Sequence, residues 1–220
     1  MALSLGLLAA CTYQGGIDNP ITIKATWFSY LAGDDIRAAC TAGALTQYRL
    51  IYNGNYEEQL RSYEVATAGS GRASYKVRVQ TGQGLDLTRL SFSDPLAPAR
   101  WDTRQEWLNG QEMAELEAAL AASGAFNPAP QGLRLASEEF YWIMSACRNG
   151  VFVFNAWRYP SQRFAALRFP GVLLRHDQTQ IALNPPRKVP ASERSRRITP
   201  GDGISLHFDL QVDPDGFVGR

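Results

Sequence analysis

The segment FYWIMSACRNGVFVFNAWRY, residues 140–159, decides the fold class of this chain. Two runs rich in aromatic and β-branched residues, 140–147 and 151–159, flank the triplet Arg148-Asn149-Gly150. Runs of this composition favour strands, and a short glycine-bearing triplet between them is typical of an antiparallel hairpin. The sequence therefore predicts a hairpin here, with antiparallel sheet as the basis of the fold.

Earlier segments of the chain have the same strand-like composition. They are residues 21–30 (ITIKATWFSY), 48–52, 56–66, 74–80 and 87–93. Glycine-bearing turns separate them at Asn53-Gly54-Asn55 and at residues 81–86. We expect the first segment to be a strand that leads into a helix, and the others to form an antiparallel meander.

Residues 204–212 alternate with the period of two that is typical of a half-buried strand. Ile204, Leu206, Phe208, Leu210 and Val212 point one way, and Ser205, His207, Asp209 and Gln211 point the other. DPDG at residues 213–216 then predicts a turn. It lacks the later ligands of a calcium loop.

One helix is expected over GDDIRAACTAG. It can begin at Gly33 or Asp34, where acidic side chains favour the first turn, and it can end at Gly43. Ile36 and Cys40 then lie four residues apart on the face to be buried.

A second helix is expected after Asn109, because Glu112 has the spacing of a capping box. It carries the apolar stripe Met113, Leu116 and Leu120. A third, short helix can follow Ser161.

The fold class is therefore α+β, built mainly from antiparallel hairpins with two or three short helices. This pattern argues against a doubly wound nucleotide-binding fold. Residues 21–217 are expected to form a single globular domain. The alternative is two lobes that meet near residues 95–132, where prolines interrupt the regular pattern.

Composition excludes several classes of partner and cofactor. The formal net charge of +1 over 220 residues gives no field that would recruit nucleic acid. The only histidines, His176 and His207, lie far apart in the sequence, so no histidine-rich metal site is expected. No phosphate-cradling glycine motif is present, and we expect no cofactor.

The sequence contains no coherent catalytic set. His207 and Asp209 share one face of a predicted strand, and a histidine beside a carboxylate can act as a general base. A nucleophile elbow is missing, however, and AGSGRAS around Ser70 is a glycine-rich turn. We therefore assign no catalytic residue.

Residues 2–10, ALSLGLLAA, form a short uncharged apolar run that ends in small residues. Such a run has the character of a secretory signal, and nine residues are too short to cross a bilayer as a helix. Leu8-Ala9-Ala10-Cys11 resembles the lipobox of bacterial lipoproteins. The resemblance implies a signal peptide at residues 1–10, a diacylglyceryl group on Cys11, and an acylated amino group after cleavage. The alternative is a buried strand with a core cysteine.

Residues 11–20 read as the lipidated cysteine and a polar tether. At about 3.3 Å per residue, residues 12–20 span at most about 30 Å, which holds the domain close to the membrane. The residue after the lipidated cysteine is Thr12 rather than Asp. The resemblance thus favours the periplasmic leaflet of the outer membrane over the inner membrane.

The two remaining cysteines are Cys40 and Cys147. In an oxidising compartment, an even remainder of cysteines suggests a disulfide. A buried helix face that meets the end of a buried strand is a feasible place for one. The alternative is a pair of reduced core cysteines, which behave as small hydrophobic residues.

A basic patch lies in PPRKVPASERSRR. Its residues are Arg187, Lys188, Arg194, Arg196 and Arg197, opposed by the single acid Glu193. Near an anionic leaflet each such charge contributes about 1 kcal/mol. The patch is a candidate for contact with anionic lipid or an anionic partner, and the alternative is a solvated loop tip.

Three functional hypotheses follow. The first is a non-catalytic interaction or assembly factor at the membrane surface, with the membrane and envelope proteins as partners. The second is a small-molecule or lipid binder with a pocket lined by Trp27, Trp142, Trp157 or neighbouring aromatic residues. The third is a hydrolase, which would need His176 or His207 in a cleft beside Ser, Asp or Glu.

Overall fold

The computed structural model describes residues 20–69, 71–82, 101–190 and 208–218, the first six of them as backbone only. The helices are α1 (Pro20–Ala32), α2 (Asp34–Ala39), α3 (Gly110–Ala122), α4 (Gln162–Ala165) and α5 (Phe169–Arg175). The strands are β1 (Gln47–Gly54), β2 (Gln59–Ala68), β3 (Arg72–Thr81), β4 (Asp102–Leu108), β5 (Arg134–Ala136), β6 (Phe140–Arg148), β7 (Val151–Arg158), β8 (Asp209–Asp213) and β9 (Gly216–Phe217). The predicted α+β class is confirmed.

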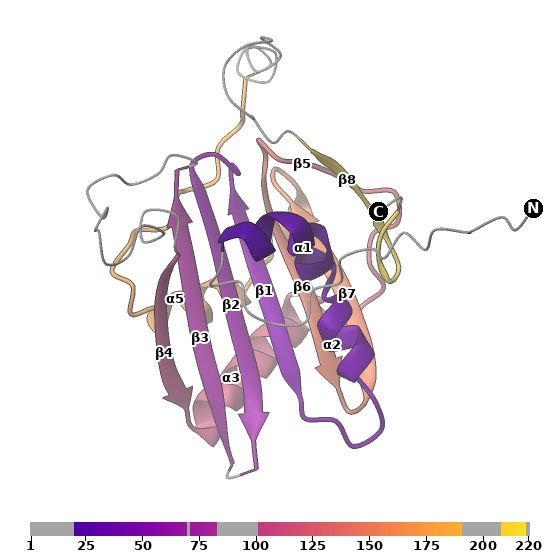
Figure 1. The fold of residues 1–220 in the computed structure, drawn as a ribbon, viewed down its shortest axis with the longest axis vertical. Coiled ribbons are helices and arrows are strands. Elements are labelled where there is room, and N and C mark those ends of the chain that lie inside the picture. The colour runs from indigo at the N-terminus through magenta and orange to yellow at the C-terminus, as the bar shows by residue number, and fades with distance from the viewer. Residues whose placement is uncertain (1–19, 70, 83–100, 191–207, 219–220) are drawn as a thin grey trace, which may run out of the picture.

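Six antiparallel strands form the main sheet, in the order β4-β3-β2-β1-β6-β7 (Figure 1). The pairing between β1 and β6 lies inside this sheet and runs from Gln47 opposite Cys147 to Gly54 opposite Phe140. A second, three-stranded sheet has the order β5-β8-β9. Both halves of the chain therefore contribute strands to one continuous sheet.

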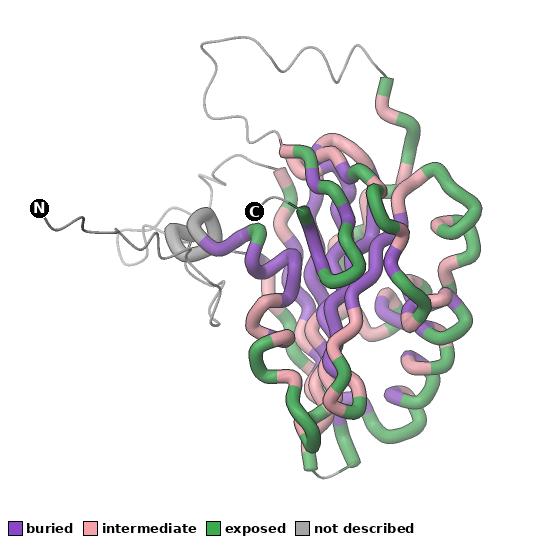
Figure 2. The backbone as a smooth tube through the Cα atoms, turned by 90° about the vertical axis from the view of Figure 1, so that its right-hand side faces the viewer, coloured by how far each residue is buried: buried purple, intermediate pink, exposed green. Residues whose placement is uncertain are grey.

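The main sheet is covered on both faces. Figure 1 shows α1 and α2 in front of it and α3 and α5 behind. The rear core joins alternate residues of the strands, such as Tyr48 and Trp142, to the apolar sides of α3 and α5. The front core joins Ile51 and Ile143 to α1 and to the small sheet. Figure 2 shows buried residues concentrated in this central layer.

The hairpin that decides the fold forms as predicted. β6 and β7 pair from Tyr141 opposite Arg158 to Arg148 opposite Val151. Asn149 and Gly150 make the turn with φ of 53° and 75°, which is the left-handed pair that a tight hairpin turn requires. A Cβ on Gly150 would lie 2.8 Å from the carbonyl oxygen of Thr41, so this position also needs glycine for space.

The predicted cap of α3 and the short helix after Ser161 are confirmed, whereas the helix expected to end at Gly43 ends at Ala39. The Asn109 side chain accepts hydrogen bonds from the amides of Gln111 and Glu112, and the Glu112 side chain accepts one from the Asn109 amide. The α3 stripe, Met113, Leu116 and Leu120, is buried. Ser161 caps α4 by accepting from the Phe164 amide.

The prediction of a strand at residues 21–30 is wrong, because this segment belongs to helix α1. Trp27, Tyr30 and Leu31 are buried and have the three- and four-residue spacing of one helix face. Packing of this face against the sheet outweighs the strand preference of β-branched and aromatic residues. Pro20 at the first helical position is the start signal that fits the helix.

Strand β4 was not expected, because its sequence DTRQEWL lacks an apolar alternation. It lies at an edge of the main sheet, where polar side chains are common. The strand predicted at residues 87–93 and the first four residues of the one predicted at 204–212 lie outside the described residues. In β8, Leu210 and Val212 are buried while Asp209 and Gln211 are exposed, as the alternation predicts.

Among the described helices, none combines the length and the apolar character needed to cross a membrane.

Candidate functional site

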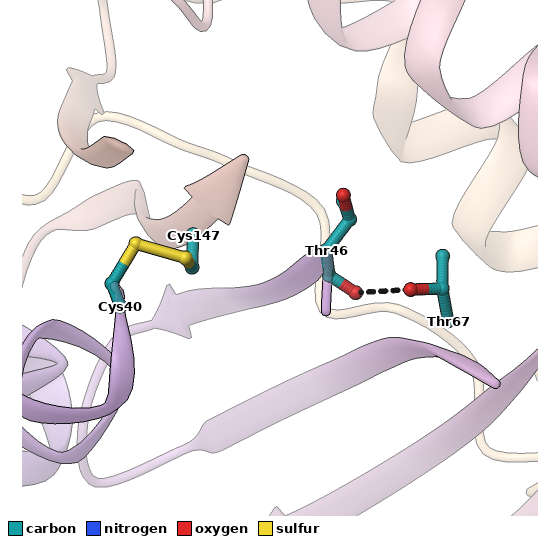
Figure 3. Close-up of a disulfide and its surroundings, with 4 residues drawn as sticks. All are labelled: Cys40, Thr46, Thr67 and Cys147. Carbon is teal, nitrogen blue, oxygen red and sulfur yellow. Dashed lines mark hydrogen bonds between the residues drawn. A yellow bond between two sulfur atoms is a disulfide. The ribbon is translucent and has the colours of Figure 1, made fainter. Parts of the chain in front are cut away.

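A disulfide joins Cys40 to Cys147, with their Cα atoms 5.4 Å apart, and this bears out the predicted pair (Figure 3). Cys40 caps the C-terminal end of α2, and Cys147 lies near the end of β6 opposite Gln47 of β1. Near this end of β1, Thr67 donates to the carbonyl oxygen of Thr46 from both its amide and its hydroxyl. The disulfide thus fixes α2 to the front face of the sheet. Cys11 lies outside the described residues.

A cavity of about 220 Å³ lies where β6 begins and β7 ends, and we call it the basic cavity. Its lining residues are Glu139, Phe140, Arg158, Tyr159, Pro160, Arg187, Lys188 and Val189. Three of these side chains are cationic and one is acidic. The basic cavity therefore carries an excess of positive charge.

Ion pairs hold two of the three cations in place. Arg158 Nε lies 3.0 Å from Glu139 Oε2, and Arg187 Nη2 lies 2.6 Å from Glu58 Oε1. The Arg187 guanidinium also lies over the Phe140 ring, 5.5 Å from its centre. Lys188 is exposed, and among the described residues it has no ion-pair partner.

The two residues from the predicted patch are carried by an irregular segment, residues 177–190, which we call the strap. Gln59 on β2 donates to the Ala182 carbonyl at 2.9 Å and accepts from the Asn184 amide at 2.9 Å. Tyr52 on β1 donates to the Asn184 carbonyl at 2.7 Å. Because neighbouring strands hold its backbone, the strap presents Arg187 at a defined position.

The structure places Arg187 and Lys188 together in the basic cavity, whereas Arg194, Arg196 and Arg197 lie outside the described residues. Sequence reasoning missed Arg158 and Glu139. Glu139 directly precedes the predicted hairpin at residues 140–159, and Arg158 is its second-last residue, so an acid and a cation stand at adjacent strand ends and meet in space. That pairing is the signal that could have found them.

A second cavity, of about 350 Å³, lies on the front face of the sheet, and we call it the polar groove. Strand pairing places Arg49, Glu64, Lys76 and Gln105 in one row across β1, β2, β3 and β4. Glu64 accepts from Arg49 Nε at 3.1 Å and from Arg78 Nη1 at 2.6 Å. Burial raises the pKa of the Glu64 carboxyl, but the two arginine charges outweigh burial and hold this pKa below its usual value.

The charges of the polar groove also dock the helices. Arg49 forms two hydrogen bonds to the Asp35 carboxylate, at 2.8 and 2.6 Å, and one to the Tyr30 carbonyl at 3.1 Å. Asp35 lies in the first turn of α2, and Tyr30 lies near the end of α1. Because Arg49 and Glu64 engage each other and the two helices, we interpret this groove as a structural network.

Of the two histidines of the hydrolase hypothesis, the structure describes only His176, which lies beside a carboxylate. His176 Nδ1 lies 3.0 Å from Glu106 Oε1, so this histidine has the carboxylate that the hydrolase hypothesis requires. Neither cavity is lined by His176 or by Glu106. His207 lies outside the described residues.

The three tryptophans proposed to line a ligand pocket are core residues. Trp142 and Trp157 are buried in the rear core, and Trp27 is buried in the front core. Neither the basic cavity nor the polar groove contains any of them. Within the described parts of the chain, no group of three or more His, Cys, Asp and Glu residues is placed to hold a metal ion.

Comparison of the chain with models of known protein families, with characterised proteins and with solved structures found no match.

Proposed function

We propose that this chain is a lipid-anchored protein of the bacterial cell envelope that acts by binding at the membrane surface rather than by catalysis. The observation that carries the proposal is the Cys40–Cys147 disulfide. Structural disulfides persist in oxidising compartments such as the periplasm and are rare in the cytosol. A chain with this bond is therefore best suited to an exported location.

The disulfide leaves Cys11 as the one cysteine of the sequence outside that bond. The sequence has three cysteines, and the disulfide uses two of them. The remaining one stands in Leu8-Ala9-Ala10-Cys11, the stretch that resembles a lipobox. Thr12 favours the periplasmic leaflet of the outer membrane, and the membrane and other envelope proteins are the proposed partners.

Binding is favoured over catalysis by the character of the two cavities. Their charged residues are arginines, lysines and carboxylates, and several of these form ion pairs with one another. Neither cavity is lined by a histidine or a cysteine. Fixed charges of this kind suit recognition of a charged ligand or surface.

The test is the intact mass of the protein purified from the membranes of its own host, beside a Cys11→Ala variant. We expect a chain that begins at Cys11 and carries the added mass of diacylglyceryl and acyl groups. The variant should lack this mass. An unprocessed parent chain with unmodified Cys11, equal in mass to the variant apart from the substitution, would refute the anchor and the location.

A further inference from the structure

We propose that the basic cavity binds a phosphate group, carried either by a phospholipid headgroup or by a small soluble phosphate. The headgroup source rests on the proposed location at a membrane, whereas the soluble source does not. The residues assigned to this site are Arg158, Lys188 and Arg187, with Arg158 and Lys188 as the principal donors to the phosphate.

The charge of the basic cavity is the first argument. Three cations line it against the single carboxylate of Glu139, and a second carboxylate, Glu58, pairs with Arg187. When both acids are counted, one positive charge remains among the described residues of the site. An anionic phosphate group fits such a site because two carboxylates do not neutralise three cations.

The available donors are the second argument. In the described part of the chain, Lys188 and the two Nη atoms of Arg158 have no hydrogen-bond partner. A guanidinium presents its N–H groups in a planar fork that matches phosphate oxygens, and an ammonium adds a compact point charge. Arg158 also contacts Glu139 through Nε, so its fork is held before a ligand arrives.

The rigidity and size of the cavity are the third argument. Arg158 lies at the end of β7, while Arg187 and Lys188 lie on the strap that Gln59 and Tyr52 hold. The guanidiniums of Arg158 and Arg187, which ion pairs hold in place, therefore lose little side-chain freedom on binding. The volume of about 220 Å³ is below the range of drug-sized pockets, which suits a small polar group.

The basic cavity lies near the tethered end of the domain, and this position would bring it close to lipid headgroups. The Trp27 ring on α1 lies 6.0 Å from the Tyr56 ring, and Glu58, two residues further along, pairs with Arg187. The helix that follows the predicted tether therefore lies near the end of the sheet at which β6 begins and β7 ends (Figure 1), and the residues of the basic cavity lie at this end. A tether of at most about 30 Å keeps this end within reach of the leaflet.

The experiment uses the full chain with Cys11→Ala and the Cys40–Cys147 bond intact, so that lipid cannot mask binding. Inorganic phosphate and glycerol phosphate are titrated at constant ionic strength while the backbone amides of Glu139, Arg158 and Lys188 are followed by NMR. In a parallel arm, vesicles of phosphatidylglycerol in phosphatidylcholine are compared with vesicles of phosphatidylcholine alone.

The variants are Arg158→Gln and Lys188→Gln, and the matched control is Arg104→Gln. Arg104 is exposed on β4, at the opposite edge of the main sheet from β7. We expect saturable binding that weakens about tenfold or more in each cavity variant and is unchanged in the control. Lys188 is exposed, so its replacement leaves the fold intact.

The arms separate the possible outcomes. Saturable NMR shifts with inorganic phosphate or glycerol phosphate would identify the ligand as a soluble phosphate. Binding to phosphatidylglycerol vesicles without binding of the free phosphates would identify it as a lipid headgroup. The chain could bind free phosphate in this titration and yet carry no lipid when its intact mass is measured from its host. That result would refute the proposed location and would still support the phosphate site. Absence of binding in both arms, or equal losses in the cavity variants and in Arg104→Gln, would overturn the site.

Discussion

Arg61 is fully buried on the rear face of the sheet, yet each nitrogen of its guanidinium has a partner. Nε donates to Gln59 at 3.0 Å, Nη1 pairs with Asp177, and Nη2 donates to the Ile181 carbonyl. The Asp177 carboxylate also accepts from the Tyr63 hydroxyl at 3.1 Å and from the Thr179 amide at 2.9 Å. A buried charge is tolerated only when it is paired in this way.

We therefore expect Asp177→Ala to lower the free energy of unfolding by about 3–5 kcal/mol, because Arg61 would be left buried without its counter-charge. The measurement is equilibrium unfolding in denaturant. The control is Glu115→Ala, which breaks the exposed pair with Arg175 and should cost about 1 kcal/mol or less. Equal effects from the two substitutions would contradict this account.

Glu64 makes the stability of the fold depend on pH. Its pKa in the folded chain lies below the ordinary value of 4.5. Its contribution to stability is therefore complete above pH 4.5 and is lost as the pH falls below it, toward the folded pKa. Glu64→Gln should be less stable than the parent at neutral pH, and the difference should shrink in acid.

Unfolding curves at several pH values between about 3 and 7 test this expectation. Glu57→Gln serves as the control, because Glu57 lies in the turn between β1 and β2, outside the polar groove. A stability difference for Glu64→Gln that does not change with pH would show that the carboxylate charge is not the cause.

Single residues also mark the limit of what the sequence predicts. The disulfide follows from a count of cysteines and the placement of Cys40 and Cys147 on a helix face and a strand end. The burial of Arg61 does not follow, because its partner Asp177 lies 116 residues away on a segment without regular structure. Only the folded sheet brings the two together.

The junction of α1 and α2 illustrates how elements depend on close backbone approach. Gly33 separates the two helices with φ of +71°, and a Cβ there would lie 2.3 Å from the Ser145 Cβ on β6. Gly43 has a similar φ of +83° but has nothing within 4 Å of the Cβ position. The two glycines share the backbone requirement and differ only in the space around them.

We expect Gly43→Ala to cost about 1 kcal/mol, which is the cost of a left-handed conformation for alanine. Gly33→Ala should cost about 1–3 kcal/mol more, because the junction must move away from the sheet. In the Gly33→Ala background, Ser145→Gly should recover part of this loss, as a thermal unfolding series would measure. Purely additive effects of the two substitutions would exclude the steric contact.

The elements themselves were predictable where local signals agree with packing. The β6–β7 hairpin and the cap of α3 carry such signals, with Asn149-Gly150 in the turn and Asn109 at the cap. Helix α1 was misread because its strand-forming residues also have helical spacing, and the sheet selects the helix. Strand β4 was missed because an edge strand needs no apolar alternation.

At the scale of the whole molecule, the disulfide closes a loop across both halves of the chain. The two cysteines are 107 residues apart in sequence. In the chain-entropy model, a loop of this length stabilises the folded state by about 4–5 kcal/mol. The bond thus links α2 of the first half to β6 of the second.

The variant Cys11→Ala/Cys40→Ala/Cys147→Ala should be less stable than Cys11→Ala by about 4 kcal/mol, measured by denaturant unfolding. A reducing agent should lower the stability of Cys11→Ala by a similar amount and leave the triple variant unchanged. If the reducing agent has no effect on either protein, the bond does not form in solution.

The candidate site was predictable only in part, for a reason that belongs to the whole fold. Arg187 and Lys188 stand out in the sequence as part of a charged run. Arg158 and Glu139 belong to the site because β6 begins beside the end of β7 and the strap passes both. Proximity of this kind arises from strand order rather than from spacing along the chain.

The pairing of β1 with β6 has a consequence for the order in which the protein folds. Strands β1, β2 and β3 are neighbours in sequence and can form their meander early, but about ninety residues separate Asn53 from its partner Tyr141. Contacts so distant slow folding, because a long stretch of chain must be ordered before they form. We expect the early meander to expose the apolar rear face of β1 until β6, α3 and α5 arrive. We expect the nascent protein to be most prone to aggregation during that interval, because this apolar face is uncovered.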